Sequence, residues 1–455
     1  MKQGWSLPLE IEYRMADIQA QQELRGVAFD VDAASDLFEK IYFEIEEIDK
    51  VLLAELPMQV IKGTEYKKVF NLDGSYKKFI TEYMGDNIDQ VGGRFCQVKY
   101  EPFNLDSSGQ VKSYLLSHGW VPTQYNTKKE GRRNVRTSPK LTEDSFASVG
   151  GSIPALVTKR SALVSRKRLL FNVRKKDSRL TGLINLVRSD GRISAEGIPQ
   201  ATNTGRFRHK NVVNIPAERA VYGKEVRSLF VPGDGYVLVG SDAAALEARI
   251  EAHYCYKFPG GEQYAHELID GDVHAKNAKW FDTDRDGAKS PKYLLSYGGA
   301  AARLSETLGC SLQRAEEIYN AFWSNNTALA GFRDAIAQQW ESRGGKSGGY
   351  LIGLDGRKIF IRSPHSAVNL TFQSGGSIIV KYATILLNQW VKKHGIDAHQ
   401  VIHYHDEFQF EVKEKYISQF RELSEKSFVK AGERFNLNVP IKGTTQVGMS
   451  WAETH

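Results

Sequence analysis

The chain has 455 residues, 41% of them hydrophobic and 25% charged, which suffices for two or three subdomains and excludes wholesale disorder. Its net charge of +7 weakly favours a polyanionic partner, and three scattered cysteines without a CxxC pair exclude a disulfide framework. With no apolar run near the roughly 20 residues of a membrane span, we expect a soluble, cytoplasmic protein that makes no membrane contact.

The first 200 residues are expected to be largely helical. Apolar residues recur every three or four positions over 8–56, and 104–120 show the same pattern. Residues 57–102 lack that period and are rich in Gly, Lys, Tyr and Phe, which predicts an inserted module of strands or loops. Residues 128–140 predict a basic loop. Over 159–176, Arg160, Lys167 and Arg174 fall seven apart, which favours a cationic helix stripe for phosphate contact over a merely solvated face.

From residue 201 onwards strands and helices are mixed. Residues 235–242 predict a buried strand that ends on an acid, 244–254 a helix, and a helical region then extends to about 342. Residues 350–364 predict a hairpin around Asp355-Gly356, and 366–394 a long helix. A second hairpin follows at 401–412, and its apolar alternation is interrupted by two adjacent acids.

Two acids at strand ends indicate a metal site. Asp242 ends one strand and Asp406 lies in the second hairpin; taken singly they are more simply a helix N-cap and a polar turn. Taken together they supply hard oxygen ligands from two strands. This arrangement suits a pair of Mg²⁺ ions about 3.5 to 4 Å apart that clamp the oxygens of a phosphoryl transfer.

A helical stripe of two cations and two tyrosines indicates a nucleotide site. Arg285, Lys289, Tyr293 and Tyr297 step by four, which turns the helix by only about 40° per step. Arginine and lysine suit a triphosphate, and tyrosine can stack on a base or sugar. Pro291 within this stripe predicts a kink in the helix or a later start.

These motifs resemble those of family A DNA polymerases, the DNA polymerase I superfamily. In the family's order they are Asp242-Ala-Ala-Ala-Leu-Glu247-Ala-Arg249, Arg285-x3-Lys289-x3-Tyr293-x3-Tyr297-Gly298 and His405-Asp406-Glu407. Thr204-Gly205-Arg206, Asp272-Val-His274, and Asn369 with Gln373 also match. QYAHELIDGDVHAKN, GLDGRK and the ending SWAETH resemble the replicative polymerases of short-tailed phages of the T-seven type. The resemblance covers the chain except 57–102.

The resemblance implies a role for each matching residue. The metals, Mg²⁺ with Mn²⁺ as a substitute, would be held by Asp242, Asp406 and the Ala243 carbonyl, with Glu407 an accessory catalytic acid near the primer end. The triphosphate would be held by His274, Arg285 and Lys289. Glu247 would exclude a 2′-hydroxyl, Tyr293 would pack beside it and permit dideoxynucleotides, and Tyr297 would lie near the templating base. Primer-template DNA would be contacted by Arg206, Arg249, Asn369, Gln373 and His405, through minor-groove acceptors that all base pairs share.

The resemblance also implies an α+β right-hand fold with an antiparallel-sheet palm. The expected parts are a helical thumb over 8–200, palm segments over 201–255 and 346–455, and helical fingers over 256–345. The insert at 57–102 could bind a processivity factor, bind DNA or lengthen the thumb. We expect no 3′–5′ exonuclease in this chain; a separate exonuclease and a helicase-primase are conceivable partners in phage replication.

Three alternatives stay open. A two-metal nuclease would also use Asp242 and Asp406, but it has no triphosphate for the Arg285–Tyr297 stripe to hold. A single-subunit RNA polymerase conflicts with Glu247, whose size and position suit rejection of ribose. A non-catalytic DNA-binding protein explains the basic thumb but not the acids and stripe together. Template-directed DNA synthesis explains all of these features.

Overall fold

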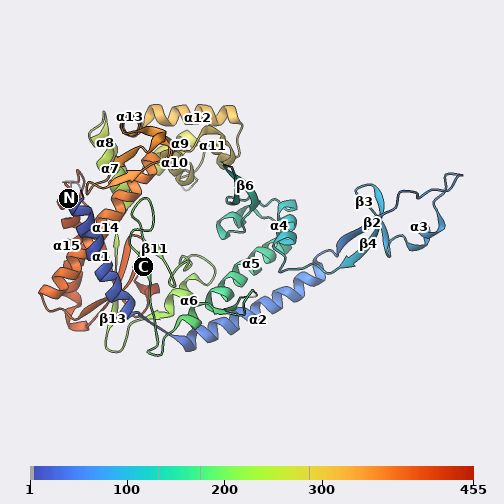
Figure 1. Ribbon diagram of the computed structural model, residues 1–455, viewed down its shortest axis with the longest axis horizontal. Coiled ribbons are helices and arrows are strands. Elements are labelled where there is room, and N and C mark those ends of the chain that lie inside the picture. Colours follow the sequence, from blue (N-terminus) through green and yellow to red (C-terminus); the bar gives the residue numbers. More distant parts are fainter. Residues whose placement is uncertain (1–4, 132, 175, 286, 455) are drawn as a thin grey trace. The chain divides into compact units, whose positions relative to one another are not determined.

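The computed structural model describes residues 5–131, 133–174, 176–285 and 287–454, without the side chains of residues 133, 134, 144, 147 and 274. The chain divides into two compact units (Figure 1). The larger unit comprises Met1–Val31, Leu186–Glu218 and Gly223–His455, and the smaller comprises Asp32–Asn185 and Arg219–Tyr222. No helix among the described residues is long and apolar enough to cross a membrane.

The larger unit holds most of the described helices and a four-stranded sheet. Its helices are α1 (Ser6–Arg25), α6 (Gly223–Ser228), α7 (Leu246–Cys255), α8 (Gly261–Ile269), α9 (Val273–Phe281), α10 (Lys289–Ser296), α11 (Ala301–Leu308), α12 (Leu312–Asn325), α13 (Thr327–Ser342), α14 (Ala367–Lys393) and α15 (Ile417–Arg434). Its strands are β1 (Val27–Phe29), β9 (Arg192–Ile193), β10 (Gly197–Ile198), β11 (Arg208–His209), β12 (Phe230–Val231), β13 (Val237–Ala243), β14 (Tyr350–Ile352), β15 (Lys358–Phe360), β16 (Ala398–Tyr404), β17 (Glu407–Val412) and β18 (Gly443–Gly448). The buried strand, both hairpins and the long helix predicted from residue 235 onwards are confirmed.

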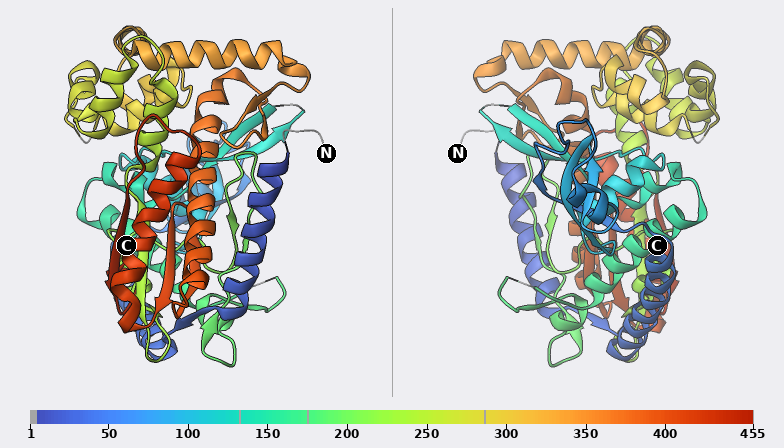
Figure 2. Two further views of the ribbon diagram at one scale, coloured as in Figure 1. Left: turned by 90° about the vertical axis from the view of Figure 1, so that its left-hand side faces the viewer. Right: turned by 90° about the vertical axis from the view of Figure 1, so that its right-hand side faces the viewer.

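A four-stranded antiparallel sheet, here called the central sheet, organises this unit. Its strand order is β16-β17-β13-β18. Residues Phe408 and Phe410 of β17 point to one face, where their rings pack against Phe428 and Phe420 of α15. Helices α1, α14 and α15 lie side by side on that face (Figure 2). Every residue of β17 is buried, so the opposite face is covered as well.

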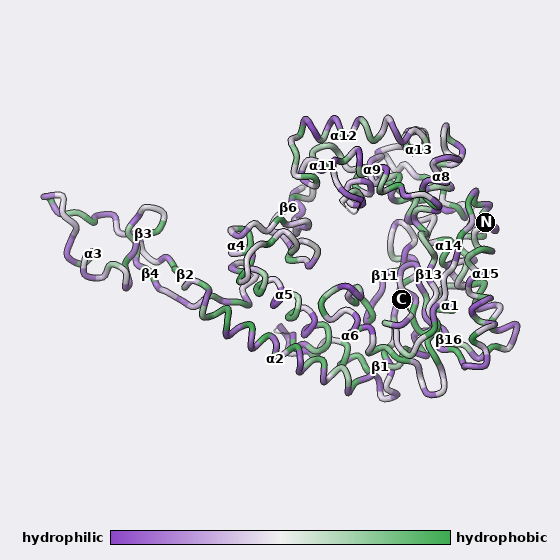
Figure 3. The backbone as a smooth tube through the Cα atoms, turned by 180° about the vertical axis from the view of Figure 1, so that it is seen from behind, coloured by the Kyte–Doolittle hydropathy of each residue, from purple (hydrophilic) through white to green (hydrophobic). Residues whose placement is uncertain are grey.

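The smaller unit begins with one long helix. Its elements are α2 (Val31–Glu55), β2 (Gln59–Glu65), α3 (Lys78–Tyr83), β3 (Ile88–Val91), β4 (Arg94–Glu101), α4 (Ser108–Ser117), β5 (Tyr125–Glu130), β6 (Arg133–Pro139), α5 (Ser152–Leu170), β7 (Asn172–Val173) and β8 (Leu180–Thr181). Apolar residues recur along α2, as the hydropathy colouring shows (Figure 3), and they form its buried side. The prediction of helix over 8–56 is wrong in one respect. The segment forms two helices, α1 and α2, which are separated by Gly26, with φ of 67°, and by strand β1.

The insert is a small module with its own core. Its sheet has the order β2-β4-β3, and Ile80, Ile88 and Phe95 are buried within it. A module containing strands at 57–102 is therefore confirmed. Two other predictions are wrong. Residues 128–140 form part of the hairpin β5–β6 rather than a loop. Arg160 does not belong to a solvent-facing stripe, because it is buried and paired with Asp49.

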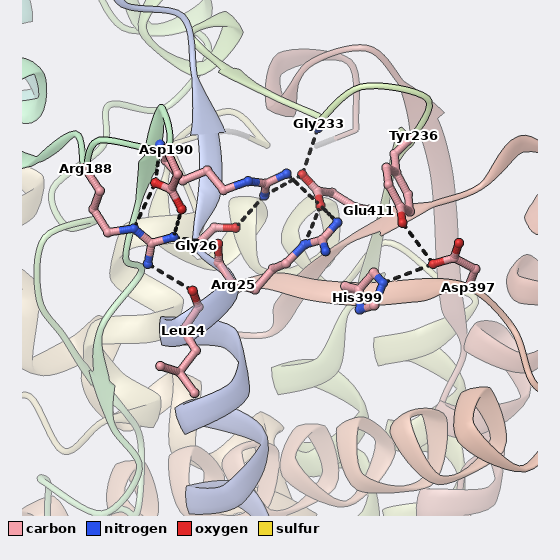
Figure 4. Close-up of polar contacts among 11 residues, drawn as sticks. Leu24, Arg25, Gly26, Arg188, Asp190, Gly233, Tyr236, Asp397, His399 and Glu411 are labelled. Atoms are coloured by element: carbon pink, nitrogen blue, oxygen red, sulfur yellow. Dashed lines mark hydrogen bonds and ion pairs between the residues drawn. The ribbon is translucent and has the colours of Figure 1, made fainter.

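The buried face of β17 opposite the phenylalanines carries acids that have specific partners. Glu411 is fully buried and its carboxylate binds Arg25 at 2.6 Å and Arg192 at 2.8 Å (Figure 4). The backbone N–H of Gly233 donates to the same carboxylate at 2.8 Å. Because a buried charge is tolerated only when it is paired and hydrogen-bonded, these contacts tie the end of α1 and strand β9 to the central sheet.

Candidate active site

Two predicted metal ligands meet at one end of the central sheet. Asp242 lies next to the last residue of β13, and Asp406 lies in the two-residue turn between β16 and β17. The backbone N–H of Ala243 donates to the carbonyl of Asp406 at 3.4 Å, so the two segments are adjacent. Asp242 is half-buried and Asp406 is exposed. Asp242 is not a helix N-cap, because Ala245 takes that place before α7.

The tight turn explains how Asp406 is presented. His405 has φ of 58°, in the left-handed region. Two-residue hairpin turns need positive φ because only then does the twist of the turn match the twist of the strands. The tight turn therefore places Asp406 just beyond the ends of β16 and β17.

Glu407 differs from its neighbour. It is buried, with only 2% of its surface exposed, and stands opposite Asp242 in the β13–β17 ladder. Its carboxylate accepts hydrogen bonds from the indole N–H of Trp451 and from Gln409, the latter at 2.8 Å. In this arrangement Glu407 fixes the C-terminal segment against the sheet. Its predicted role near the primer end stays a prediction.

The donor set suits divalent cations that are completed by ligands from a substrate. Carboxylate and carbonyl oxygens are the ligands that Mg²⁺ prefers, and Mg²⁺ is commonly held by one or two carboxylates together with substrate phosphates. Asp242, Ala243 and Asp406 provide such a set. No cluster of three or more His, Cys, Asp or Glu side chains able to hold a metal occurs in the described part of the chain.

The stripe predicted to bind the nucleotide is only partly helical. Helix α10 begins at Lys289, so Arg285 precedes it and Tyr297 caps its end. Pro291 falls in the first turn, where a backbone N–H has no partner within the helix, and it does not break the helix. The later start considered for this helix is confirmed, and no kink is needed. Arg285 is paired with Asp272, the residue that caps α9.

Tyr297 lies beside Glu247, whereas the resemblance implies that place for Tyr293, and the roles of both tyrosines stay predictions. The ring centroids of Tyr293 and Tyr297 lie 5.8 Å apart. Burial raises the pKa of the Tyr297 phenol far above its usual value, and the neighbouring Glu247 carboxylate acts in the same direction. Tyr297 is thus the tyrosine whose hydroxyl lies beside Glu247. His274 lies on α9, but its side chain is outside the described part of the structure.

The predicted DNA contacts lie on four segments. Asn369 and Gln373 lie one turn apart on α14, so they share a face. Arg206 follows Gly205, whose φ of 74° marks a tight turn. His405 lies in the turn described above, and Arg206 and Asp406 line a common cavity of about 30 Å³ with it. Arg249 is different, because it is buried and donates to the carbonyls of Ala244 and Pro440 at 2.9 and 2.7 Å. Its DNA contact stays a prediction.

Three histidines surround that cavity, and sequence reasoning singled out only His405. The His209 ring is uncharged at neutral pH, because burial lowers its pKa to about 4. Burial, with His209 and Lys381 nearby, lowers the pKa of His403 well below its usual value. Neither ring nitrogen of His403 has a hydrogen-bond partner within the described residues. The ring of His403 stacks on Phe207 with centroids 4.4 Å apart. These aromatic contacts join β11 to the hairpin, and no short motif marks them in the sequence.

The chain matches the protein-family model described as DNA polymerase family A over residues 75–453. The match begins inside the insert. Among curated relatives, a DNA-directed DNA polymerase of Escherichia phage Phieco32 is 24% identical, with 99% of each chain covered. That of Escherichia phage T7 is 28% identical, over 99% of this chain and 71% of its own.

A solved structure gives the same picture for the fold. The POL domain of Pol1 from M. smegmatis, in complex with DNA primer-template and dNTP, superposes with a TM-score of 0.70. It is 21% identical in sequence, and the alignment covers 97% of this chain and 70% of that one. At this identity the likeness shows the fold.

Proposed function

Because the chain belongs to DNA polymerase family A, we propose that its Asp242–Asp406 site adds deoxynucleotides to a primer 3′ end under the direction of a DNA template. The family, the α+β right-hand fold and the DNA-directed DNA polymerase function expected from the three motifs are confirmed. One observation above others supports the proposal for the site: the end of β13, which carries Asp242, lies next to the β16–β17 turn, which carries Asp406.

The chain's own groups have distinct tasks at this site. Asp242, Asp406 and the Ala243 carbonyl would hold two Mg²⁺ ions, which supply positive charge for the oxygens of the phosphoryl transfer. The carboxylates fix where that charge lies relative to the primer end. Lys289 and Arg285 hold the triphosphate, since a point charge and a planar fork neutralise its oxygens. Arg285 exchanges its pairing with Asp272 for the phosphate when a nucleotide arrives.

Sugar selection is assigned to Glu247. Its carboxylate, beside the Tyr297 hydroxyl, leaves no room for a ribose 2′-hydroxyl in this proposal. Glu247→Ala is expected to raise ribonucleotide incorporation relative to deoxynucleotide incorporation by about 10²-fold or more, because removing a side chain opens space for the hydroxyl. An unchanged ratio in single-nucleotide assays would contradict this role and reopen the RNA polymerase alternative.

The DNA is contacted near the primer end, at the minor-groove acceptors of its base pairs, by Arg206, Asn369, Gln373 and His405. For the insert we propose three roles: it binds a processivity factor, binds DNA directly or lengthens the thumb. A separate exonuclease and a helicase-primase are the further partners we propose for phage replication. The phage relatives favour action in the cytoplasm of an infected host cell.

Primer extension tests the proposal. The wild type and Asp406→Ala are compared on a labelled primer-template with Mg²⁺ and deoxynucleotides, alongside a lane without nucleotides. Extension by the wild type alone, with an intact primer when nucleotides are absent, supports an exonuclease-free polymerase. Primer shortening that disappears in the variant would instead identify a two-metal nuclease. Binding of DNA without extension or degradation by the wild type would favour the non-catalytic alternative.

A further inference from the structure

Helix α14 carries a polar stripe that extends beyond the predicted DNA contacts. Asn369, Gln373, Ser377 and Lys381 follow one another at steps of four, each advancing by only about 40° around the helix. The first two are half-buried, whereas Ser377 is 8% and Lys381 only 1% exposed. A lysine this deeply buried requires partners. The C-terminal half of the stripe therefore faces the interior of the protein.

Lys381 is held by a buried ionic network. Its ammonium donates to both carboxylate oxygens of Glu12 on α1, at 2.7 and 2.8 Å. Arg357, at the start of the second strand of the β14–β15 hairpin, pairs with the same carboxylate at 2.7 Å. Arg357 is itself 4% exposed and paired with Asp355 at 2.7 Å. Three segments distant in the sequence thus meet at Glu12.

This network encloses the loop that carries Arg206. Lys381 donates to the carbonyl of Pro199 at 2.7 Å, and Ser377 donates to the carbonyl of Gly205 at 2.8 Å. A Cβ added at Gly205 would lie 2.6 Å from Nη1 of Arg357, so the guanidinium packs directly against this glycine. The loop is fixed both before Arg206 and at the residue next to it. The cavity that Arg206 and Lys381 line also reaches Asp406.

We propose that Glu12, Arg357 and Lys381 are positioning residues that hold the Gly205–Arg206 loop in register with the primer 3′ end, and that they thereby determine how strongly a correctly paired end is preferred. The inference rests on the proposed polymerase function. None of the three side chains touches DNA; each acts through Arg206. A mispaired end displaces the minor-groove acceptors, so a fixed Arg206 distinguishes it and a loosened Arg206 does not.

The test is single-turnover extension of a matched and of a mismatched primer end. Lys381→Met is expected to slow matched extension by at least about tenfold while mismatched extension changes little. The reason is that a displaced Arg206 weakens the alignment of a correctly paired end, whereas a mispaired end is not aligned by Arg206 in the first place. The ratio of the two rates then falls about tenfold, and KM for the deoxynucleotide changes less. The double variant Glu12→Gln/Lys381→Met should be no worse than Lys381→Met, since it also removes the buried carboxylate that has lost one of its two cationic partners.

Glu411→Gln is the matched control. Glu411, like Glu12, is a carboxylate with two cationic partners, but its partners Arg25 and Arg192 lie at the other end of β17 (Figure 4). It is expected to lower stability and leave the matched-to-mismatched ratio unchanged. Equal ratios for wild type, Lys381→Met and Glu411→Gln would overturn the inference and leave the network a purely structural one.

A milder variant keeps the test independent of folding. Ser377→Ala removes one hydrogen bond to Gly205 and is expected to lower the same ratio about threefold. An unchanged ratio in Ser377→Ala, with Lys381→Met unfolded, would also overturn the inference. If the wild type itself fails to extend the matched primer, the proposed function fails first and the inference with it.

Discussion

His405 occupies a position in the β16–β17 turn that favours glycine. Its φ of 58° is unfavourable for a residue with a Cβ by about 1 to 2 kcal/mol. Contacts of the His405 ring with Tyr404 and His209 offset part of this cost; the ring centroids lie 4.4 and 5.4 Å from that of His405. Strain kept at such a place is consistent with a functional need for the side chain next to the metal ligand.

Two substitutions of His405 separate strain from function. Both His405→Gly and His405→Ala remove the ring, but only glycine relieves the strain, so the glycine variant should be more stable than the alanine variant by about 1 kcal/mol. Urea denaturation measures this difference. Both variants should lose primer-end affinity equally. If alanine is as stable as glycine, the turn does not hold the conformation described.

His253 makes the fold sensitive to acid. Burial lowers its pKa from 6.5 to about 4, and Lys257 contributes in the same direction. Its neutral Nδ1 accepts the backbone N–H of Asn438 at 3.2 Å. Between these two pKa values the unfolded chain binds a proton that the folded chain does not. Stability therefore falls as the pH is lowered from 6.5 towards 4.

The contribution of His253 can be isolated by substitution. From near pH 7 to near pH 5, His253→Gln should lose about 1 kcal/mol less unfolding free energy than the wild type, a full shift of about 2 kcal/mol being reduced by the partial exposure of the ring. His209 and His403 preserve part of the dependence in the variant. Urea denaturation at both pH values provides the measurement, and parallel losses in the two proteins would exclude His253 as a cause.

At the scale of single residues, the motifs predicted the places of Asp242, Asp406 and the α10 residues because these lie at strand or helix ends, where local pattern fixes geometry. Glu407 could not be placed in this way. Its burial depends on Trp451, 44 residues away. A two-residue period says which face a side chain takes, but not what covers that face.

Among the elements, α10 tolerates its proline because of where the helix begins. The first intrahelical bond runs from the N–H of Lys292 to the carbonyl of Ala288, after Pro291. Pro291→Ala should therefore change the free energy of unfolding by less than about 1 kcal/mol, whereas a proline at Leu295, inside the helix, should cost about 3 kcal/mol or more. Chemical denaturation of both variants checks this. A large gain for Pro291→Ala would mean that the proline strains the helix after all.

The insert is expected to be removable. Val60 and Tyr100 stand opposite each other in the β2–β4 ladder, so an Asn-Gly turn can join them in place of residues 61–99. The deleted segment takes its own core with it. The melting temperature should stay within about 4 °C of the wild type, and single-nucleotide incorporation within about threefold. The number of nucleotides added per binding event would reveal the insert's role.

A melting temperature lowered by more than about 10 °C would contradict the independence of the insert. The result would mean that its sheet supports the helices α2 and α4 that flank it.

Elements were predictable where one face is buried and periodic, as in β13, α14 and the β16–β17 hairpin. The β5–β6 hairpin was not, because most of its described side chains are exposed and polar, so no apolar alternation marks them. Arg160 was misjudged for a related reason. Its seven-residue spacing to Lys167 indicates a shared helix face, but charge pattern alone does not show that Asp49 lies opposite.

For the whole chain, the order of three motifs was enough to indicate the family and the right-hand fold, both confirmed by the comparisons. The smaller compact unit does not have the bounds of the predicted thumb, 8–200, because Met1–Val31 and Leu186–Glu218 belong to the larger unit. Helix α1 packs within the larger unit through long-range pairs such as Glu12 with Lys381, which are 369 residues apart. Sequence periodicity carries no information on pairings of this range, so neither the unit boundary nor the Glu12 network could be predicted.

The most direct test of the account is single-turnover incorporation of one nucleotide by the wild type, Asp242→Asn, Asp406→Asn and the double variant, with DNA affinity measured in parallel. If both carboxylates serve one site, each single variant should be slower by at least about 10³-fold, and the double variant about as slow as the worse single variant, while DNA binding persists. A single variant within about tenfold of the wild type, or a double variant whose loss is the product of the two single losses, would contradict a shared two-carboxylate site.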